Sequence, residues 1–505
     1  MSFNPSVDDV INILIATDNH LGYAEKDPVR CADSITTFEE VLKIAVERDV
    51  DMVLLGGDLF HDNKPSRWVL HSCMRLLRQY CFNDKAVKLE LLSDPSIDFS
   101  HSSFPSVNYQ NPHINVGIPV FSIHGNHDDL TGNPSLCTLD LLHTCGLINF
   151  FGKYAQNVEK IEVSPILLRK GVTKLALHGI GSIRDERFHR MFLNKQVSFL
   201  RPSDDDGEWF NLLTLHQNRT KHGETNYIPD TFIPDFFTLV LWGHEHPCRI
   251  KPEWVGCTKN MYITQPGSSV ATSLCEGEAG DKYIAHLSIY KDKFKLDPIK
   301  LQTVRPFYFE EVKLADTGID PTTRKGIDEV EAFCAEKVEE MLNRAAKQCR
   351  IETRRPKKPL IRLRVDHSGG FDTFNIQRFG QRFVDRVANP KDLILFHRRR
   401  DQGTNRHNMS LIDGDIMDEL VKPETLDTTR VEDLVKEYFT SLEPDKQLLV
   451  LTETGLGEAI KQFVDKDERE AVMMIVKHQL QKTRQKVEVS SGDFDYVEFR
   501  FNVCQ

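Results

Sequence analysis

The sequence has no paired cysteine motif, no long apolar run and no export pattern near its N-terminus. Its 11 cysteines include no C-x-x-C pair, which excludes a zinc ribbon of the usual kind and favours free thiols in a reducing compartment. No stretch approaches the ~18 uninterrupted apolar residues of a membrane span. The opening residues, MSFNPSVDDV, lack the basic and apolar regions of a secretory signal. These absences predict a cytosolic or nuclear protein that does not enter a membrane.

Charge is unevenly distributed along the chain. The formal net charge of −11 argues against a protein that coats nucleic acid indiscriminately. The segment Arg354–Arg400 has 13 Lys or Arg against 4 Asp, a balance of +9, which leaves −20 for the rest of the chain. That segment predicts either a surface for a phosphate backbone or an ordinary solvated face, and charge alone does not separate the two. Within it, Arg354–Lys358 (RRPKK) is a candidate nuclear localisation signal.

Short apolar runs that end in polar clusters recur in the first half of the chain. Such β-rich runs, separated by helix-length segments, predict an α/β or α+β core of packed sheets. Because open α/β sheets hold their ligands at the carboxyl ends of strands, the clusters predict one shared site. The runs are Ile11–Thr17, Met52–Gly57, Pro119–Ile123, Lys174–Leu177, Leu212–Leu215, Phe236–Trp242 and Met261–Thr264.

Helical patterns occupy several of the intervening segments. Ser34–Glu47 has an apolar face, and the stripe on Pro65–Tyr80 predicts either a core contact or a dimer face. Phe82–Gly117 is polar and aperiodic, which predicts a long inserted loop. Further helices are expected at Asp328–Gln348, Thr429–Ser441 and Leu456–Arg484, and Val487–Cys504 alternates like a strand.

The segment Asp51–His61 (DMVLLGGDLFH) places Asp58 at the mouth of a buried strand. A buried carboxylate is costly unless a cation or hydrogen bonds compensate it, so Asp58 is either a metal ligand or a helix N-cap. The residues at the strand ends are too many for one ion and suit two ions that share Asp58. Carboxylate, imidazole and amide ligands favour manganese, iron or zinc over magnesium. Two such metal ions side by side support hydrolysis of a phosphoester. The set is Asp18, His20, Asp58, Asn126, His127, His216, His244 and His246.

The ordered series D-x-H, G-D, G-N-H-D, H and G-H-x-H resembles that of the calcineurin-like metallophosphoesterases. This resemblance implies an α+β fold, in which a two-sheet β-sandwich flanked by helices carries a dinuclear centre on its loops. It also implies the ligands of each ion. One ion would be held by Asp18, His20, Asp58 and His246, and the other by Asp58, Asn126, His216 and His244.

A narrower resemblance covers about Ile11 to Arg484. Phosphoprotein phosphatases carry an arginine in the second motif, whereas this chain reads Gly57-Asp58-Leu59-Phe60-His61. With Thr17–Tyr23 (TDNHLGY) and Leu451–Val464 (LTETGLGEAIKQFV), it resembles the SbcD-type DNA nucleases, and in particular the eukaryotic nuclease subunit of the MRN/MRX complex. The resemblance implies a manganese-dependent 3′–5′ double-strand exonuclease and single-strand endonuclease, with two manganese ions. It would process DNA ends in double-strand-break repair and meiotic recombination in the nucleus.

The same resemblance implies three residue roles. His127 would donate a proton to the leaving oxygen, Asp128 would orient His127, and His61 would position the substrate phosphate or nucleotide. Imidazole titrates near neutrality, so the role of His127 is chemically reasonable in its own right.

The resemblance also implies an architecture and a set of partners. Residues 1–300 would form the metallophosphoesterase domain, 301–410 an α/β DNA-binding capping domain, and 411–486 a linker with C-terminal helices. A homodimer would form through Pro65–Tyr80 and a helix near Pro134–Cys145. The insert 82–117 would bind an Nbs-type subunit and residues 456–484 a coiled-coil ABC ATPase, while 487–505 has no assigned role.

Two alternatives belong to other classes. One is a phosphomonoesterase or phosphoprotein phosphatase on the same fold, against which the basic segment and His61 argue. The other is a DNA-end-tethering scaffold with secondary nuclease activity, and the complete ligand set argues against its extreme form.

Overall fold

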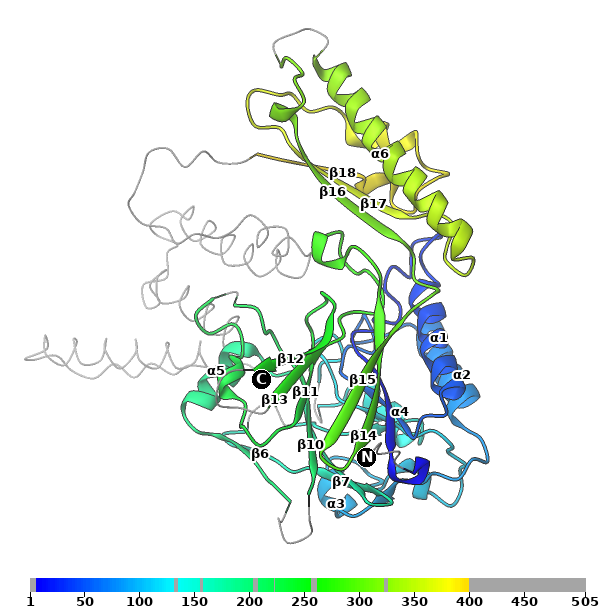
Figure 1. The fold of residues 1–505 in the computed structure, drawn as a ribbon, viewed down its shortest axis with the longest axis vertical. Helices are drawn as coiled ribbons and strands as arrows, with labels where there is room; N and C mark the ends of the chain where they lie inside the picture. Colours follow the sequence, from blue (N-terminus) through cyan, green and yellow to red (C-terminus); the bar gives the residue numbers. More distant parts are fainter. Residues whose placement is uncertain are drawn as a thin grey trace, which may run out of the picture. The chain divides into compact units, whose positions relative to one another are not determined.

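The computed structural model describes residues 6–398, apart from 131–134, 155–157, 203–207, 222, 256–260 and 322–325 (Figure 1). The helices expected at Thr429–Ser441 and Leu456–Arg484, the linker 411–486 and the tail 487–505 lie outside the described residues. Within the described part, no helix combines the length and apolarity that crossing a membrane requires. All cysteines that the structure describes are free thiols.

Two mixed sheets form the core of the first 300 residues. The first sheet has the order β15 (Lys293–Lys300), β14 (Tyr283–Tyr290), β1 (Ile11–Ala16), β2 (Met52–Leu55), β4 (Val120–Ser122) and β5 (Asn149–Phe150). The second has the order β12 (Arg249–Val255), β13 (Met261–Gln265), β11 (Leu239–Gly243), β10 (Phe210–His216), β8 (Thr173–Ile180), β7 (Ile166–Lys170) and β3 (Glu90–Leu91). A separate ribbon pairs β6 (Ile161–Val163) with β9 (Val197–Phe199).

The two sheets pack face to face through one apolar cluster. Ile13 and Leu54 of the first sheet share this cluster with Leu175 and Leu212 of the second. Side chains alternate along a strand, so Leu14 of β1 points to the opposite face. This arrangement is the predicted two-sheet β-sandwich.

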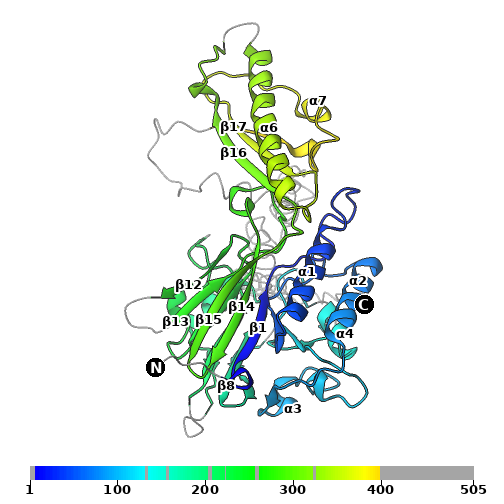
Figure 2. The ribbon, with the colours of Figure 1, turned by 45° about the vertical axis from the view of Figure 1, so that its right-hand side comes forward.

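Helices cover the outer faces of the sandwich. The outer face of the first sheet packs against α1 (Asp33–Glu47), α2 (Arg67–Cys81) and α4 (Thr138–Thr144), which lie together beside β1 in Figure 2. On the second sheet, Phe188 of α5 (Asp185–Leu193) packs against Trp242 and its neighbours. Central strands buried on both faces explain why the sequence reads as continuous apolar runs.

Two sequence predictions differ from the observed elements. The helix predicted from Pro65 begins at Arg67, because the Ser66 side chain accepts a hydrogen bond from the Val69 amide and caps the helix. The insert Phe82–Gly117 is more ordered than its polar sequence predicted. It contains β3, α3 (Pro95–Asp98) and a 3₁₀ turn at Asn108–Gln110, and it buries Phe99 in the sandwich core.

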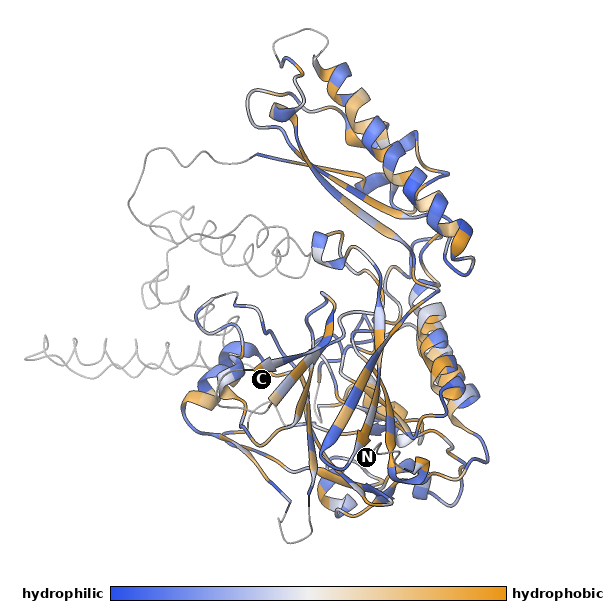
Figure 3. Cartoon of the chain, viewed as in Figure 1, coloured by the Kyte–Doolittle hydropathy of each residue, from blue (hydrophilic) through white to orange (hydrophobic). Residues whose placement is uncertain are grey.

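A smaller three-stranded sheet follows residue 300. Parallel strands β16 (Phe307–Lys313), β17 (Leu360–Asp366) and β18 (Ile394–His397) pack against α6 (Gly326–Ile351) and α7 (Ile376–Gln381). Hydrophobic and hydrophilic stretches alternate along α6 in Figure 3, as expected for a helix with one face on a sheet. Arg305 leads into this sheet and bonds both carboxylate oxygens of Asp33, at 2.6 and 2.8 Å.

Candidate metal centre

Five loops bring the predicted site residues to one place. They follow β1, β2 and β4 of the first sheet and β10 and β11 of the second. Each set of strands is parallel, with Ala16 opposite Leu55 in the first sheet and His216 opposite Gly243 in the second. The carboxyl ends of these strands therefore meet, which explains why residues far apart in sequence share one site.

The ligand atoms form two adjoining groups. Asp18, His20 and His246 place their ligand atoms within 4.8 Å of one another, and Asp58, His216 and His244 do the same. The Nε2 atoms of His20 and His246 are 3.1 Å apart. Such close approach of two imidazole nitrogens suits a shared cation.

Asp58 lies between the two groups. Its Oδ2 is 3.8 Å from His20 Nε2 and 3.4 Å from His216 Nε2, so it faces both. Asn126 adds an amide oxygen to the second group, 3.1 Å from His216 Nε2 and 2.8 Å from His244 Nδ1. The position of Asp58 between the two groups is the one expected of a carboxylate that bridges two ions.

The donor set fits divalent cations. Asp18 Oδ1 and Asp58 Oδ2 are buried, and neither oxygen has a hydrogen-bond partner among the described residues. A buried carboxylate oxygen without a partner is costly, and a bound cation removes that cost. Carboxylate, imidazole and amide ligands together match manganese, iron or zinc.

Four imidazoles of the site, those of His127, His216, His244 and His246, are oriented through their outer nitrogens, whereas Nδ1 of His20 has no hydrogen-bond partner within the described residues. A ring N–H that donates to an outer oxygen fixes the tautomer and leaves the inner nitrogen unprotonated, as metal-binding histidines require. The four bonds are His216 Nδ1 to Gly56 O at 2.9 Å, His244 Nε2 to Asn218 Oδ1 at 2.8 Å, His246 Nδ1 to Glu278 Oε1 at 3.0 Å, and His127 Nδ1 to His61 O at 2.6 Å.

Four of the predicted ligands have a left-handed backbone. Their φ angles are 52° for Asp18, 45° for His20, 49° for Asp58 and 81° for His244. Non-glycine residues adopt this region at a cost of about 1–3 kcal/mol each, and such strain clusters at functional sites. The backbone of these loops is therefore strained locally, and this conformation directs the four side chains into the site.

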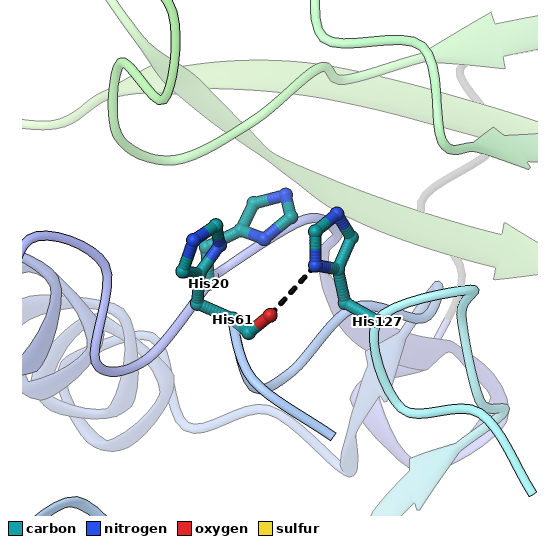
Figure 4. Close-up of side chains that lie close together, drawn as sticks. All are labelled: His20, His61 and His127. Atoms are coloured by element: carbon teal, nitrogen blue, oxygen red, sulfur yellow. Dashed lines mark hydrogen bonds between the residues drawn. The ribbon is translucent and has the colours of Figure 1, made fainter. Parts of the chain in front are cut away.

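Histidines 20, 61 and 127 form a second constellation beside the carboxylates (Figure 4). The rings of His61 and His127 stack at 5.1 Å and 22°, and His20 meets His127 edge-on at 4.9 Å. Figure 4 shows the His61 carbonyl oxygen directed at Nδ1 of His127. The bond through Nδ1 thus fixes the His127 ring next to the predicted ligands.

Asp128 contacts backbone amides. Its carboxylate accepts hydrogen bonds from the N–H groups of Leu59, Phe60 and Gly125, at 3.0, 3.0 and 3.3 Å. Among the described contacts, the His61 carbonyl orients the His127 ring and Asp128 does not touch it. Asp128 instead ties the loop after β2 to the loop after β4.

Charges in the site favour cation binding. Burial alone would raise the pKa of Asp58, but His216 and His20 lower that pKa well below its usual value. Burial likewise opposes a charge on His216, yet Asp58 raises the pKa of this imidazole to about 9. The Asp58 carboxylate is therefore ionised, and a cation bound beside it would displace the second proton of His216.

The sequence patterns did not reveal the residues that orient the predicted ligands. Glu278 lies 32 residues beyond its partner His246. Asn218, which accepts from His244, is itself held by Asp185 through a 2.7 Å bond. Neither Glu278 nor Asp185 follows an apolar run as the ligands do, so no local pattern distinguishes them from surface carboxylates.

The sandwich and its histidine–carboxylate centre define a metallophosphoesterase. In agreement, the calcineurin-like phosphoesterase family matches residues 11–248, and the Mre11 DNA-binding presumed domain matches residues 294–463. The chain is therefore a phosphoesterase that uses divalent metal ions.

Relatives that match nearly the whole chain show to which family of metallophosphoesterases it belongs. Double-strand break repair protein MRE11 of Rattus norvegicus is 51% identical over 94% of this chain and 67% of its own length. The Homo sapiens protein of that name is 51% identical over 96% and 68%, and that of Arabidopsis thaliana is 43% identical over 95% and 65%. The chain belongs to the MRE11 family of double-strand break repair proteins. The predicted family and fold class are confirmed.

Proposed function

We propose that this protein is a manganese-dependent DNA nuclease that processes broken DNA ends. Its activities would be 3′–5′ double-strand exonuclease and single-strand endonuclease, used in double-strand-break repair and meiotic recombination in the nucleus. The observation that carries the proposal is a fixed His127 ring beside a dinuclear ligand set. MRE11 relatives named for double-strand break repair support the DNA substrate.

Two ions would occupy the adjoining groups and share Asp58. Asp18, His20 and His246 complete the first site, and the second is formed by Asn126, His216 and His244. When bound, the ions supply Lewis acidity, which lowers the pKa of a water molecule and neutralises charge on a phosphate oxygen. The imidazole-rich ligand set is the reason to propose manganese instead of magnesium.

His127 would act as the general acid. Its Nδ1–H donates to the His61 carbonyl, and this bond holds the ring so that Nε2 would face the leaving oxygen. The stacked His61 ring would position the scissile phosphate. Asp128 would be a positioning residue, since its carboxylate accepts from the amides of Leu59 and Gly125 and so joins the loops that carry Asp58 and His127.

The small sheet after residue 300 would be the DNA-binding capping domain, within the proposed bounds 301–410. Several of its cations are already paired, as Arg382 is with Glu331 and Arg386 with Glu339. Arg354 and Arg378 are exposed, and neither has an ion pair within the described residues. These exposed cations favour a phosphate backbone over an ordinary solvated face.

Exposed apolar side chains support the proposed partners. Trp68 of α2 is 46% exposed and Leu141 of α4 is 53% exposed, which suits a homodimer through these two helices. In the insert 82–117, Ile97 and Phe104 are each 61% exposed, which suits an Nbs-type subunit. The proposed contact of residues 456–484 with a coiled-coil ABC ATPase lies outside the described residues. A dimer would also allow DNA-end tethering, the second candidate function.

The test is cleavage of blunt duplex, hairpin and single-stranded DNA with manganese, with a phosphomonoester substrate in parallel. We expect DNA cleavage with manganese and much less with magnesium. Hydrolysis of the phosphomonoester without cleavage of any DNA would overturn the proposal in favour of a phosphatase.

Two variants separate metal binding from proton transfer. Asp58→Ala removes the shared ligand, so we expect loss of both ions and of cleavage. His127→Asn keeps the backbone N–H that donates to Asp58 Oδ1 at 2.8 Å, so we expect both ions to remain while cleavage falls by roughly 10²–10⁴-fold. Loss of a single ion from Asp58→Ala would count against a shared ligand. DNA bridging that survives in His127→Asn would show tethering independent of cutting.

A further inference from the structure

A buried carboxylate behind the metal centre has no role in the proposed reaction. Glu278 ends the 3₁₀ turn Glu276–Glu278 and is 2% exposed. Its two oxygens accept hydrogen bonds from both sides of the turn and from one ligand. These donors are His246 Nδ1 at 3.0 Å, Ser268 Oγ at 3.1 Å, Thr272 N at 3.1 Å, Ser273 N at 2.9 Å and Lys282 Nζ at 3.1 Å.

The bond to His246 determines the tautomer of this ring. An ionised carboxylate only accepts hydrogen bonds, so Nδ1 of His246 must carry the proton. Nε2 is then unprotonated, and it points toward His20 Nε2 at 3.1 Å and Asp18 Oδ1 at 3.8 Å. Glu278 thereby aims the metal-binding lone pair of His246 at the first ion site.

Lys282 keeps the carboxylate charged. Its Nζ lies 3.1 Å from Glu278 Oε2, and both side chains are buried, so the two groups form an ion pair away from water. Thr272 reinforces the arrangement, because its Oγ1 lies 2.9 Å from His246 Nδ1 and 3.1 Å from Glu278 Oε1. A charged acceptor strengthens an imidazole ligand more than a neutral one does.

The other two metal-facing rings with outer bonds have neutral acceptors. His216 donates to the Gly56 carbonyl, and His244 donates to the Asn218 side chain. Loss of the charge at Glu278 should therefore weaken one ion site selectively.

We propose that Glu278 is a positioning residue for His246 and sets the affinity of the ion held by Asp18, His20 and His246. This inference rests on the dinuclear centre of the proposed function. The carboxylate holds the ring in the Nδ1–H tautomer and increases the donor strength of Nε2.

The experiment measures Mn²⁺ binding to the full chain by calorimetry and by metal content after dialysis. Glu278→Gln keeps the shape and removes the charge, and Glu276→Gln, an exposed position in the same turn, is the matched control. We expect Glu278→Gln to weaken one of two bound ions by roughly 10–100-fold and leave the other unchanged. We expect the control to bind both ions as the wild type does.

Removal of the charge leaves Lys282 unpaired, which could lower stability for a reason unrelated to metal. The double variant Glu278→Gln/Lys282→Met removes both buried charges, and its metal-free melting temperature reports the fold separately. This double variant should still bind one of its two ions more weakly than the wild type does.

A mutant cycle with His246→Ala tests whether Glu278 acts through this ring. In that background, Glu278→Gln should cause no further loss of Mn²⁺ affinity. An independent additional loss, or wild-type binding of both ions by Glu278→Gln, would overturn the inference. Wild-type protein that binds fewer than two ions would refute the dinuclear proposal itself. This result comes from the wild type alone, so it is distinct from a failure of the inference about Glu278.

Discussion

Replacement of Asp128 by asparagine tests what this buried carboxylate does. Its Oδ2 accepts from the amides of Leu59 and Gly125, and its Oδ1 accepts from the amide of Phe60. Asparagine has the same shape but only one carbonyl oxygen. In either orientation of the amide, at least one of these buried N–H groups faces an NH₂ donor instead of an acceptor.

The size of the effect follows from those bonds. A buried N–H without a partner costs about 1–3 kcal/mol, and the bonds that remain lose their charge assistance. We therefore expect the free energy of unfolding of the metal-free protein to fall by about 2–4 kcal/mol. Because Leu59 follows Asp58 directly, the Mn²⁺ affinity should fall as well.

The assay is urea unfolding of metal-free protein together with Mn²⁺ titration. Burial first, and then the neighbouring Asp58, raise the pKa of Asp128 to about 7, so the comparison is made near pH 8.5, at which the carboxylate is ionised. Asp129→Asn is the control, since Asp129 is exposed. An unfolding free energy within about 0.5 kcal/mol of the wild type, with only the pH profile of cleavage shifted, would refute this reasoning. Asp128 would then act on His127, as the family resemblance implied.

Three further measurements follow from the structure. Gly57 has φ +96°, and a Cβ there would collide with the His216 ring, so Gly57→Ala should lose about 1–3 kcal/mol in urea unfolding and bind Mn²⁺ more weakly. Burial lowers the pKa of His101 from 6.5 to about 4. Because the unfolded chain then binds this proton at a higher pH than the folded chain does, the free energy of unfolding should fall by up to about 3 kcal/mol as the pH drops from 6.5 to about 4. A His101→Phe variant should lack this slope, and an unchanged slope would exclude His101 as its source. Lys170 forms a buried ion pair with Asp51 at 2.7 Å, so Lys170→Met should cost about 3–5 kcal/mol in the same assay, and a cost below 1 kcal/mol would contradict the pairing.

The sequence predicted the site better than it predicted the surroundings of the site. Asp18, Asp58 and His216 each follow an apolar run, and parallel strands bring such ends together whatever the loops between them do. This rule needs only the strand pattern, so it predicted without any knowledge of side-chain contacts that these residues come together, as they do in the structure. Helices α1 and α2 followed from their apolar periodicity, apart from their first residues, whereas α4 was expected only from the family resemblance and α5 was not predicted.

The remainder depended on contacts that no local pattern records. Glu278 and Asp185 resemble surface carboxylates in sequence, yet both are hydrogen-bonded behind the site. The polar insert 82–117 is tied to the sandwich by three scattered buried residues, Leu89, Phe99 and Val107, which form no periodic pattern. Asp128 follows His127 directly, but its carboxylate turns toward a loop some 68 residues earlier in the chain.

The strand order has a consequence for synthesis of the protein. β1 lies between β2 and β14, with Ile11 opposite Ile289, so one edge of an early strand finds its partner only after β14 leaves the ribosome. At about 5–20 residues per second this interval lasts roughly 15–60 s, during which an apolar edge has no pairing strand. His20 precedes His246 by 226 residues, so these two candidate ligands meet only after about 11–45 s. Final closure of the first sheet and assembly of the metal centre should therefore be late and nearly simultaneous events.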